Sequence, residues 1–287
     1  MDGIGVGTAE PPLAQLGRRI EAAGATRLGA ATLAAARALH DVVGQLRPTG
    51  DELRAALEFL TEVGQGSDEQ RQEWVLLADV IGVSTLVEDL NAPRPAGATP
   101  QTMPGPFYRA DAPELPDGAD LSRDGRGERL AIRGQVRALR GQPVAGASVE
   151  IWQPDGEGLQ EDQDPDRQPE FNLRGRLRAD AEGRFACLSV KPGPTRLPDD
   201  GPVGQLMAAL GLGTDRPAHV LFRVTAPGFR PLVTHVFDRE DPLVGRDPLF
   251  GVRPELLFPF RAPAKDRDGP PFRLDVTLTL CPDGGEP

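Results

Sequence analysis

The spacing of apolar residues changes once along this chain, across a proline-dense stretch, and this change most constrains the fold. From residue 13 to about residue 92 apolar residues recur every three to four positions, which predicts helices. Residues 91–106 contain five prolines, which break helices and cannot donate to a sheet ladder. From about residue 130 short apolar runs alternate with Gly, Pro and Asp, which predicts strands. We therefore expect an α+β chain, with a helical domain and linker over residues 1–100 and an antiparallel β-sandwich over residues 101–287.

Local signals predict where individual elements begin. Thr49–Glu52 fits a capping box, in which a Thr hydroxyl and a Glu carboxylate satisfy free amides at a helix start, and Ser67–Gln70 repeats the pattern. Leu53, Leu57 and Leu60 form an apolar stripe after the first cap, and we expect such helical surface to make a homodimer. Strands are expected at residues 130–137, 147–152, 219–225, 232–237 and 272–280.

Composition argues against several classes of partner and location. The 287 residues include 32 Lys plus Arg and 43 Asp plus Glu, a net charge of -11, so we expect neither a nucleic-acid partner nor an anionic membrane. No apolar stretch approaches the roughly 20 residues that cross a bilayer. Two cysteines are too few for a disulfide scaffold, and residues 1–12 lack a basic start followed by an apolar run. A cytoplasmic protein without a signal peptide is expected.

Six short motifs resemble the intradiol ring-cleavage dioxygenases in kind and order. They lie at residues 103–108, 149–153, 198–204, 216–219, 226–229 and 234–237. The resemblance extends over about residues 50–260, and it is most similar to the hydroxyquinol 1,2-dioxygenase branch. It implies a helical N-terminal dimerisation domain and a β-sandwich that carries the active site. In that family a ferric ion held by two tyrosines and two histidines binds a catechol-type diol before O2 attacks the ring.

Three of the four positions of this chain that match the iron ligands carry other residues. The tyrosine positions hold Gln160 and Thr195, and the histidine positions hold His219 and Leu221. Tyr108 is the one tyrosine of the chain, so a two-tyrosine site is excluded. Fe(III) is a hard ion that phenolates supply with donor atoms and negative charge, which these replacements do not provide. We expect the ferric site to be lost and no cofactor or metal to be used.

The positions that line the substrate cavity in the family match better than the ligand positions. The resemblance assigns to that cavity Leu76, Asp79, Met103, Gly105, Pro106, Phe107, Leu197, Pro198, Arg216 and Leu249, with His235 beside the substrate. A binding cleft for a small molecule is therefore expected, with Gln160, Thr195 and Leu221 filling the former metal space. Arg216 could instead pair with a carboxylate such as Asp162 or Asp215. The acidic run at residues 161–166 predicts an exposed loop, because buried like charges repel.

The preferred hypothesis is a cofactor-independent enzyme acting on a small oxygenated aromatic or polyketide-like molecule by cyclisation, rearrangement, hydration or C–C bond adjustment. His219, titrating near neutral pH, would transfer a proton, and Arg216 would stabilise an anionic oxygen. His235, Gln160 and Thr195 would position the substrate. One alternative is a non-catalytic binding protein. Another is a ring-cleavage dioxygenase with a rebuilt metal site, made by the two histidines with a carboxylate from Asp79 or Asp162.

Overall fold

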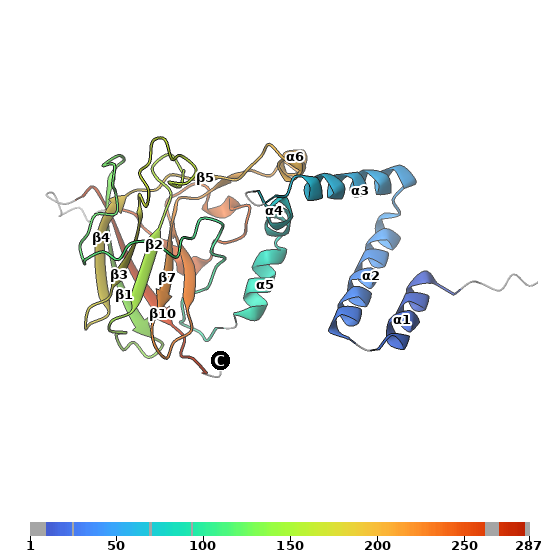
Figure 1. Ribbon diagram of the computed structural model, residues 1–287, viewed down its shortest axis with the longest axis horizontal. Coiled ribbons are helices and arrows are strands. Elements are labelled where there is room, and N and C mark those ends of the chain that lie inside the picture. Colours follow the sequence, from blue (N-terminus) through green and yellow to red (C-terminus); the bar gives the residue numbers. More distant parts are fainter. Residues whose placement is uncertain (1–9, 25, 69–70, 93, 262–269, 285–287) are drawn as a thin grey trace, which may run out of the picture. The chain divides into compact units, whose positions relative to one another are not determined.

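Helices and strands follow the expected order in the computed structural model, which describes residues 10–24, 26–68, 71–92, 94–261 and 270–284 (Figure 1). The expectation about a leader segment falls largely on residues 1–9, outside the described residues. Glu69 and Gln70, half of the second capping pattern, also lie outside them. Within the described residues no helix combines the length and hydropathy that crossing a bilayer requires.

The N-terminal region is helical, as predicted. Its helices are α1 Pro12–Ala22, α2 Arg27–Leu46, α3 Gly50–Gln65, α4 Glu73–Val80 and α5 Val83–Asn91. The capping box at the start of α3 is confirmed: the Thr49 amide donates to Glu52 Oε2 at 2.7 Å, and the Glu52 amide donates to Thr49 Oγ1 at 3.2 Å. At the second pattern, the Trp74 amide donates to Ser67 Oγ at 3.3 Å. The Thr49 cap marks the start of α3, because it satisfies amides that have no partner inside the helix. Helix α4 begins later than the second pattern predicts: Gln72 is its N-cap residue and makes no side-chain cap hydrogen bond.

The chain divides into two compact units, Met1–Glu62 and Val63–Pro287. Helices α4 and α5 belong to the second unit, where the Thr85 hydroxyl of α5 donates to the Leu249 carbonyl at 2.9 Å and Arg71 pairs with Asp200 at 2.8 Å. The boundary expected near residue 100 stays a prediction, because compact packing does not by itself show which segment folds independently.

The second unit contains two sheets that pack on one another and a small ribbon (Figure 1). One sheet has the order β10-β1-β4, with β1 Arg129–Ala138, β4 Arg184–Val190 and β10 Phe272–Leu280. The other has the order β3-β2-β7-β8-β9, with β2 Ser148–Trp152, β3 Arg174–Arg178, β7 His219–Thr225, β8 Leu232–Asp238 and β9 Leu257–Phe258. The ribbon pairs β5 Thr195–Arg196 with β6 Asp215–Arg216. The shorter helices are α6 Pro202–Ala209, η1 Val244–Arg246 and η2 Pro254–Leu256.

The core lies between the two sheets. Phe185 of β4 and Phe222 of β7 have ring centroids 6.2 Å apart, and both side chains are buried. Ile132 and Leu274 from one sheet and Val149 from the other join the same buried cluster. Alternate residues of each strand point inward, so the period of two read from the sequence is the signature of this shared core.

The sheets are mixed, and the expectation of a wholly antiparallel sandwich was wrong in this respect. Strand β1 pairs in parallel with β10, and β8 pairs in parallel with β9. A long stretch of chain separates β1 from β10, so no hairpin turn forces the antiparallel direction. The five expected strands are present, whereas β3 and β4 were not predicted. Strand β3 reads Arg-Gly-Arg-Leu-Arg, in which arginines hide the apolar alternation.

Candidate functional site

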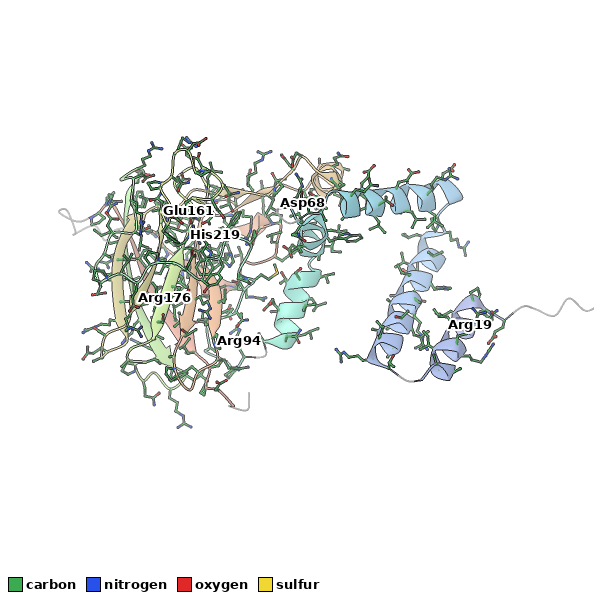
Figure 2. The ribbon with its side chains drawn as sticks, in the orientation of Figure 1. Arg19, Asp68, Arg94, Glu161, Arg176 and His219 are labelled. Carbon is green, nitrogen blue, oxygen red and sulfur yellow. The ribbon has the colours of Figure 1, made fainter. Side chains whose placement is uncertain are left out.

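Two buried histidines lie on neighbouring strands of the larger sheet. His219 begins β7 and pairs in register with Phe237, while Leu221 pairs with His235 of β8. The imidazole centroids are 4.9 Å apart, and His235 stacks on Phe237 at 5.5 Å. Residues two apart on a strand share a face, so the same side of the sheet carries His219 and Leu221. Figure 2 marks His219 within this part of the chain.

Hydrogen bonds define how each imidazole is presented. Nδ1 of His219 donates to the Pro217 carbonyl at 2.8 Å, because a carbonyl oxygen only accepts. In neutral His219 the Nε2 atom therefore carries the lone pair. Nδ1 of His235 shares a hydrogen bond with the Thr102 hydroxyl at 2.6 Å, and a hydroxyl can either donate or accept. This bond joins the proline-dense linker to β8.

Burial keeps both imidazoles neutral. It lowers the pKa of His219 from 6.5 to about 3, with a smaller contribution from the charge of Arg216. Burial also lowers the pKa of His235 well below 6.5, together with the charges of His219 and Arg216. The expectation that His219 titrates near neutral pH was wrong, because solvent exclusion disfavours the imidazolium.

Arg216 is held by a carboxylate that the sequence did not single out. Its Nε donates to Asp247 Oδ1 at 2.9 Å and its Nη2 to Asp247 Oδ2 at 3.2 Å. The expected alternative partners were Asp162 and Asp215, and neither is the partner in this pair. The charge of Arg216 also acts on Asp79, His219 and His235.

Some buried polar side-chain atoms have no hydrogen-bond partner within the described part of the chain. They are Asp79 Oδ1, Gln160 Oε1 and Trp152 Nε1. Burial raises the pKa of Asp79, against the hydrogen bond from Ser84 and the charge of Arg216. A buried polar atom without a partner costs free energy, and a bound molecule can recover that cost by supplying the missing hydrogen bond. Asp79 and Gln160 offer acceptors.

The remaining predicted site residues differ in exposure. Leu221 and Leu249 are buried, and so are His219, His235 and Gln160. Intermediate exposure is found at Leu76, Met103, Phe107, Thr195 and Leu197. Gly105, Pro106 and Pro198 are exposed. The contacts join Thr195 to Arg216 through the β5-β6 pair and Arg216 to Leu249 through Asp247, while the role of the exposed positions stays a prediction.

Sequence reasoning missed a buried ion pair beside the site. Arg174 of β3 donates from Nε and Nη2 to the two carboxylate oxygens of Glu161, at 2.7 and 2.5 Å, and from Nη1 to the Phe107 carbonyl at 2.6 Å. The side chains of Arg174 and Glu161 are only 1% and 3% exposed, so the expectation of an exposed acidic run was wrong at Glu161. Figure 2 marks Glu161. The pair joins the Gln160 loop to the linker. No local sequence pattern predicts this ion pair, because Arg174 and Glu161 come from separate segments.

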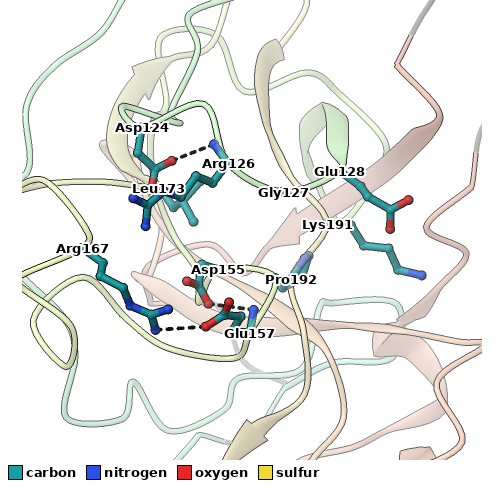
Figure 3. Close-up of a pocket in the computed structure, with 11 residues that line it drawn as sticks. Asp124, Arg126, Gly127, Glu128, Asp155, Glu157, Arg167, Leu173, Lys191 and Pro192 are labelled. Carbon is teal, nitrogen blue, oxygen red and sulfur yellow. Dashed lines mark hydrogen bonds and ion pairs between the residues drawn. The ribbon is translucent and has the colours of Figure 1, made fainter.

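A separate hollow of about 430 Å³ lies at another place in the second unit (Figure 3). Its lining residues are Asp124, Arg126, Gly127, Glu128, Asp155, Gly156, Glu157, Arg167, Leu173, Lys191 and Pro192. Arg167 points to Glu157, with which it forms an ion pair of 2.9 Å. The hollow carries charges of both signs, and none of the predicted site residues lines it.

The rebuilt metal site does not form in the described residues. They contain no group of three or more His, Cys, Asp or Glu side chains placed to hold a metal ion. Burial, followed by the charge of Glu161, raises the pKa of Asp162.

Comparison with known proteins finds matches over most of the chain. Residues 26–99 match the model described as catechol dioxygenase N terminus, and residues 103–279 match the model described as dioxygenase. A hydroxyquinol 1,2-dioxygenase of Rhizobium sp. is 46% identical over 78% of this chain and 76% of its own. A 6-chlorohydroxyquinol 1,2-dioxygenase of Cupriavidus pinatubonensis is 39% identical over 86% of this chain and 87% of its own. The solved hydroxyquinol 1,2-dioxygenase of Pseudomonas putida DLL-E4 has a TM-score of 0.90 at 35% identity, covering 94% of this chain and 97% of that one.

These matches correct the expectation that the chain uses no cofactor, because the dioxygenases they describe point to an iron cofactor. At the four positions that the resemblance assigns to iron ligands, the side chains differ from the two tyrosines and two histidines that it implies for a ferric ion. His219 offers one nitrogen, Gln160 and Thr195 are neutral, and Leu221 has no lone pair. Tyr108 is engaged elsewhere, since its hydroxyl donates to Glu150 at 2.8 Å.

Proposed function

We propose a function from the premise that this chain belongs to the intradiol ring-cleavage dioxygenase family: it binds a polyhydroxylated aromatic ring of the hydroxyquinol type beside His219, His235 and Arg216. Several relatives of this chain are named hydroxyquinol 1,2-dioxygenase, which supports this class of ligand. The chain also carries His235 and Arg216 at positions that the resemblance matches to the family's substrate cavity, and the buried His219 at a matched ligand position.

One observation carries the proposal, namely that the buried side-chain atoms without a partner in the described part of the chain are mainly acceptors. Asp79 Oδ1 and Gln160 Oε1 have no partner among the described residues, and Nε2 of neutral His219 presents a lone pair. Ring hydroxyl groups supply the hydrogen-bond donors that such atoms require. Nη1 of Arg216 can donate to a ring oxygen in return. A neutral ring with several hydroxyl groups therefore suits this arrangement.

The reaction expected from the sequence is constrained by the neutral histidines. With its pKa near 3, His219 is a weak base, and each pKa unit between donor and acceptor costs about 1.4 kcal/mol in a proton transfer. We therefore propose that His219 binds a ring hydroxyl as an acceptor and that Arg216 stabilises negative charge on a ring oxygen. A cyclisation, rearrangement, hydration or C–C bond adjustment would draw on that stabilisation.

Ring cleavage is the second candidate, favoured by the 46% identity to a hydroxyquinol 1,2-dioxygenase. A purely binding role is the third, favoured by the weak basicity of His219. We also propose that the cavity wall includes residues predicted from the resemblance, namely Leu76, Met103, Gly105, Pro106, Phe107, Thr195, Leu197, Pro198, Leu221 and Leu249.

The test is an anaerobic titration of the purified protein with hydroxyquinol, followed by calorimetry. Saturable binding with one site per chain is the expected result, and no heat of binding at millimolar hydroxyquinol would contradict the proposal. Product analysis in air, with oxygen consumption measured before and after incubation with iron salts, separates the three candidates. Oxygen uptake with ring-opened product supports cleavage, a product without oxygen uptake supports the other reactions, and unchanged ligand supports binding alone.

A further inference from the structure

Asp247 gathers four hydrogen bonds on one buried carboxylate. Two come from Arg216, as described above, and its side chain is 2% exposed against 11% for Arg216. The other two come from the backbone: the Leu249 amide donates to Oδ1 at 3.3 Å and the Gly251 amide to Oδ2 at 2.9 Å. The carboxylate therefore joins the guanidinium of β6 to the loop that follows η1.

The loop is shaped around this pair. A Cβ at Gly251 would lie 3.0 Å from Arg216 Nη2 and 3.1 Å from Asp247 Oδ2, so a larger residue there would press on the contact. Phe250 adopts a left-handed conformation, with φ of 55°, and the Leu249 carbonyl accepts from Thr85 of α5 at 2.9 Å. Helix α5, which carries Thr85, is thereby connected to the Arg216 side chain through one loop.

Asp247 keeps its charge in this buried place. Burial by itself raises its pKa, but the charge of Arg216 and the hydrogen bonds received outweigh burial and hold the pKa below 3.8. A bidentate carboxylate occupies the Nε and Nη2 edge of a guanidinium and restricts its rotation. The Nη1 edge of Arg216 then remains for another acceptor.

We propose that Asp247 is a positioning residue, which locks the guanidinium of Arg216 so that its Nη1 edge meets an oxygen of the bound ring. The ligand part of this inference rests on the proposed function. In this proposal Asp247 does not touch the ring and acts on it only through Arg216. The effect of Asp247 on binding therefore depends on Arg216 being present.

A double-mutant cycle tests that dependence, with anaerobic hydroxyquinol as the probe. Asp247→Asn keeps the shape of the side chain but removes its charge, and we expect affinity to fall about tenfold, as for Arg216→Ala, the scale of one charge-assisted hydrogen bond. The double variant should bind within twofold of Arg216→Ala. Independent, multiplying losses would overturn the proposal. Glu255→Gln is the matched control, because Glu255 is an exposed partner of Arg94 on η2 and should leave affinity unchanged.

A ligand-free measurement tests the lock even if hydroxyquinol does not bind. The Nε–H signal of Arg216 in a 15N NMR spectrum, assigned by its loss in Arg216→Lys, should persist at pH 8 in the wild-type protein. Fast exchange with water, like that of the exposed Arg37, would overturn the lock without reference to any ligand. A persistent signal together with no hydroxyquinol binding would retain the lock and reject the proposed function, including the ligand part of this inference.

Discussion

The two imidazoles of the site show how burial decides the chemistry of a residue. His219 and His235 are 3% and 4% exposed, and both are kept neutral by desolvation. Neutral imidazoles act as hydrogen-bond acceptors or donors rather than as cations. This favours a ligand that brings hydroxyl groups over one that brings a carboxylate.

The lowered pKa values predict acid sensitivity. Above pH 6.5 the folded and unfolded states both hold neutral His219, and its contribution to stability is fully present. Between pH 6.5 and about 3 the unfolded state takes up a proton that the folded state does not. The free energy of unfolding should therefore fall with acidification, by up to about 1.4 kcal/mol per pH unit for such a residue.

Urea unfolding at pH 7.5, 6.5 and 5.5 measures this effect. His219→Gln should reduce the pH dependence and leave the part that the buried His235 contributes, whereas His40→Gln should retain all of it because His40 is exposed on α2. Identical slopes in the two variants would show that His219 does not carry the effect.

Removing Nε2 of His219, which is a hydrogen-bond acceptor, should weaken ligand binding. His219→Ala is expected to lower the affinity for hydroxyquinol at least about tenfold, because one hydrogen bond to a buried acceptor is lost. Calorimetry under anaerobic conditions measures the affinity, and circular dichroism checks folding. A variant that is folded and binds like the wild type would place the ring elsewhere.

Among the elements, β3 holds the linker that crosses its edge. Arg174 donates to the Phe107 carbonyl and Arg176 to the Ala110 carbonyl, at 2.6 and 2.9 Å. Two residues apart on the strand, these arginines share one face. The sequence of β3 hides its strand character because two of its arginines, Arg174 and Arg176, bond to this linker.

Breaking the buried Arg174–Glu161 ion pair should lower the free energy of unfolding more than breaking an exposed ion pair. Arg174→Met leaves the Glu161 carboxylate buried with Arg109 at 3.6 Å as its remaining cation, and we expect a loss of about 3 kcal/mol in the free energy of unfolding. Arg184→Met, which removes an exposed arginine paired with Asp180 and Glu182, should cost less than about 1 kcal/mol. Urea unfolding compares the two variants, and equal losses would contradict the role of burial.

At the scale of the whole molecule, α2 and α3 expose large apolar side chains. Leu28, Leu39 and Leu46 of α2 are 78%, 65% and 75% exposed, and Leu53 and Leu57 of α3 exceed half exposure. Exposed apolar surface of this extent marks an interaction site. We propose that a second copy of the chain covers it, in line with the match of residues 26–99 to the N-terminal family model.

Light scattering should give twice the chain mass of 30.7 kDa at micromolar concentration. The double variant Leu39→Glu and Leu46→Glu should give a monomer, because buried carboxylates oppose association. Leu210→Glu, at a 63% exposed leucine beyond α6, is the control and should remain a dimer. A monomeric wild-type protein would reject the proposal.

The sequence by itself determined that a helical region precedes a region of strands, that a capping box precedes α3, and the tyrosine count that bears on the family's iron ligands. These features are local or are counts, so periodicity and composition report them directly. The antiparallel expectation was wrong at β1 and β10, since strand direction across a long connection is not encoded locally.

Only the tertiary structure decided the protonation of His219, the pairing of Arg216 with Asp247 and the burial of Glu161 against Arg174. The physical reason is common to all three. A pKa and an ion pair depend on how much water is excluded and on which charges arrive from distant segments. Asp247 stands 31 residues beyond Arg216, and only the folded chain brings its carboxylate to the guanidinium.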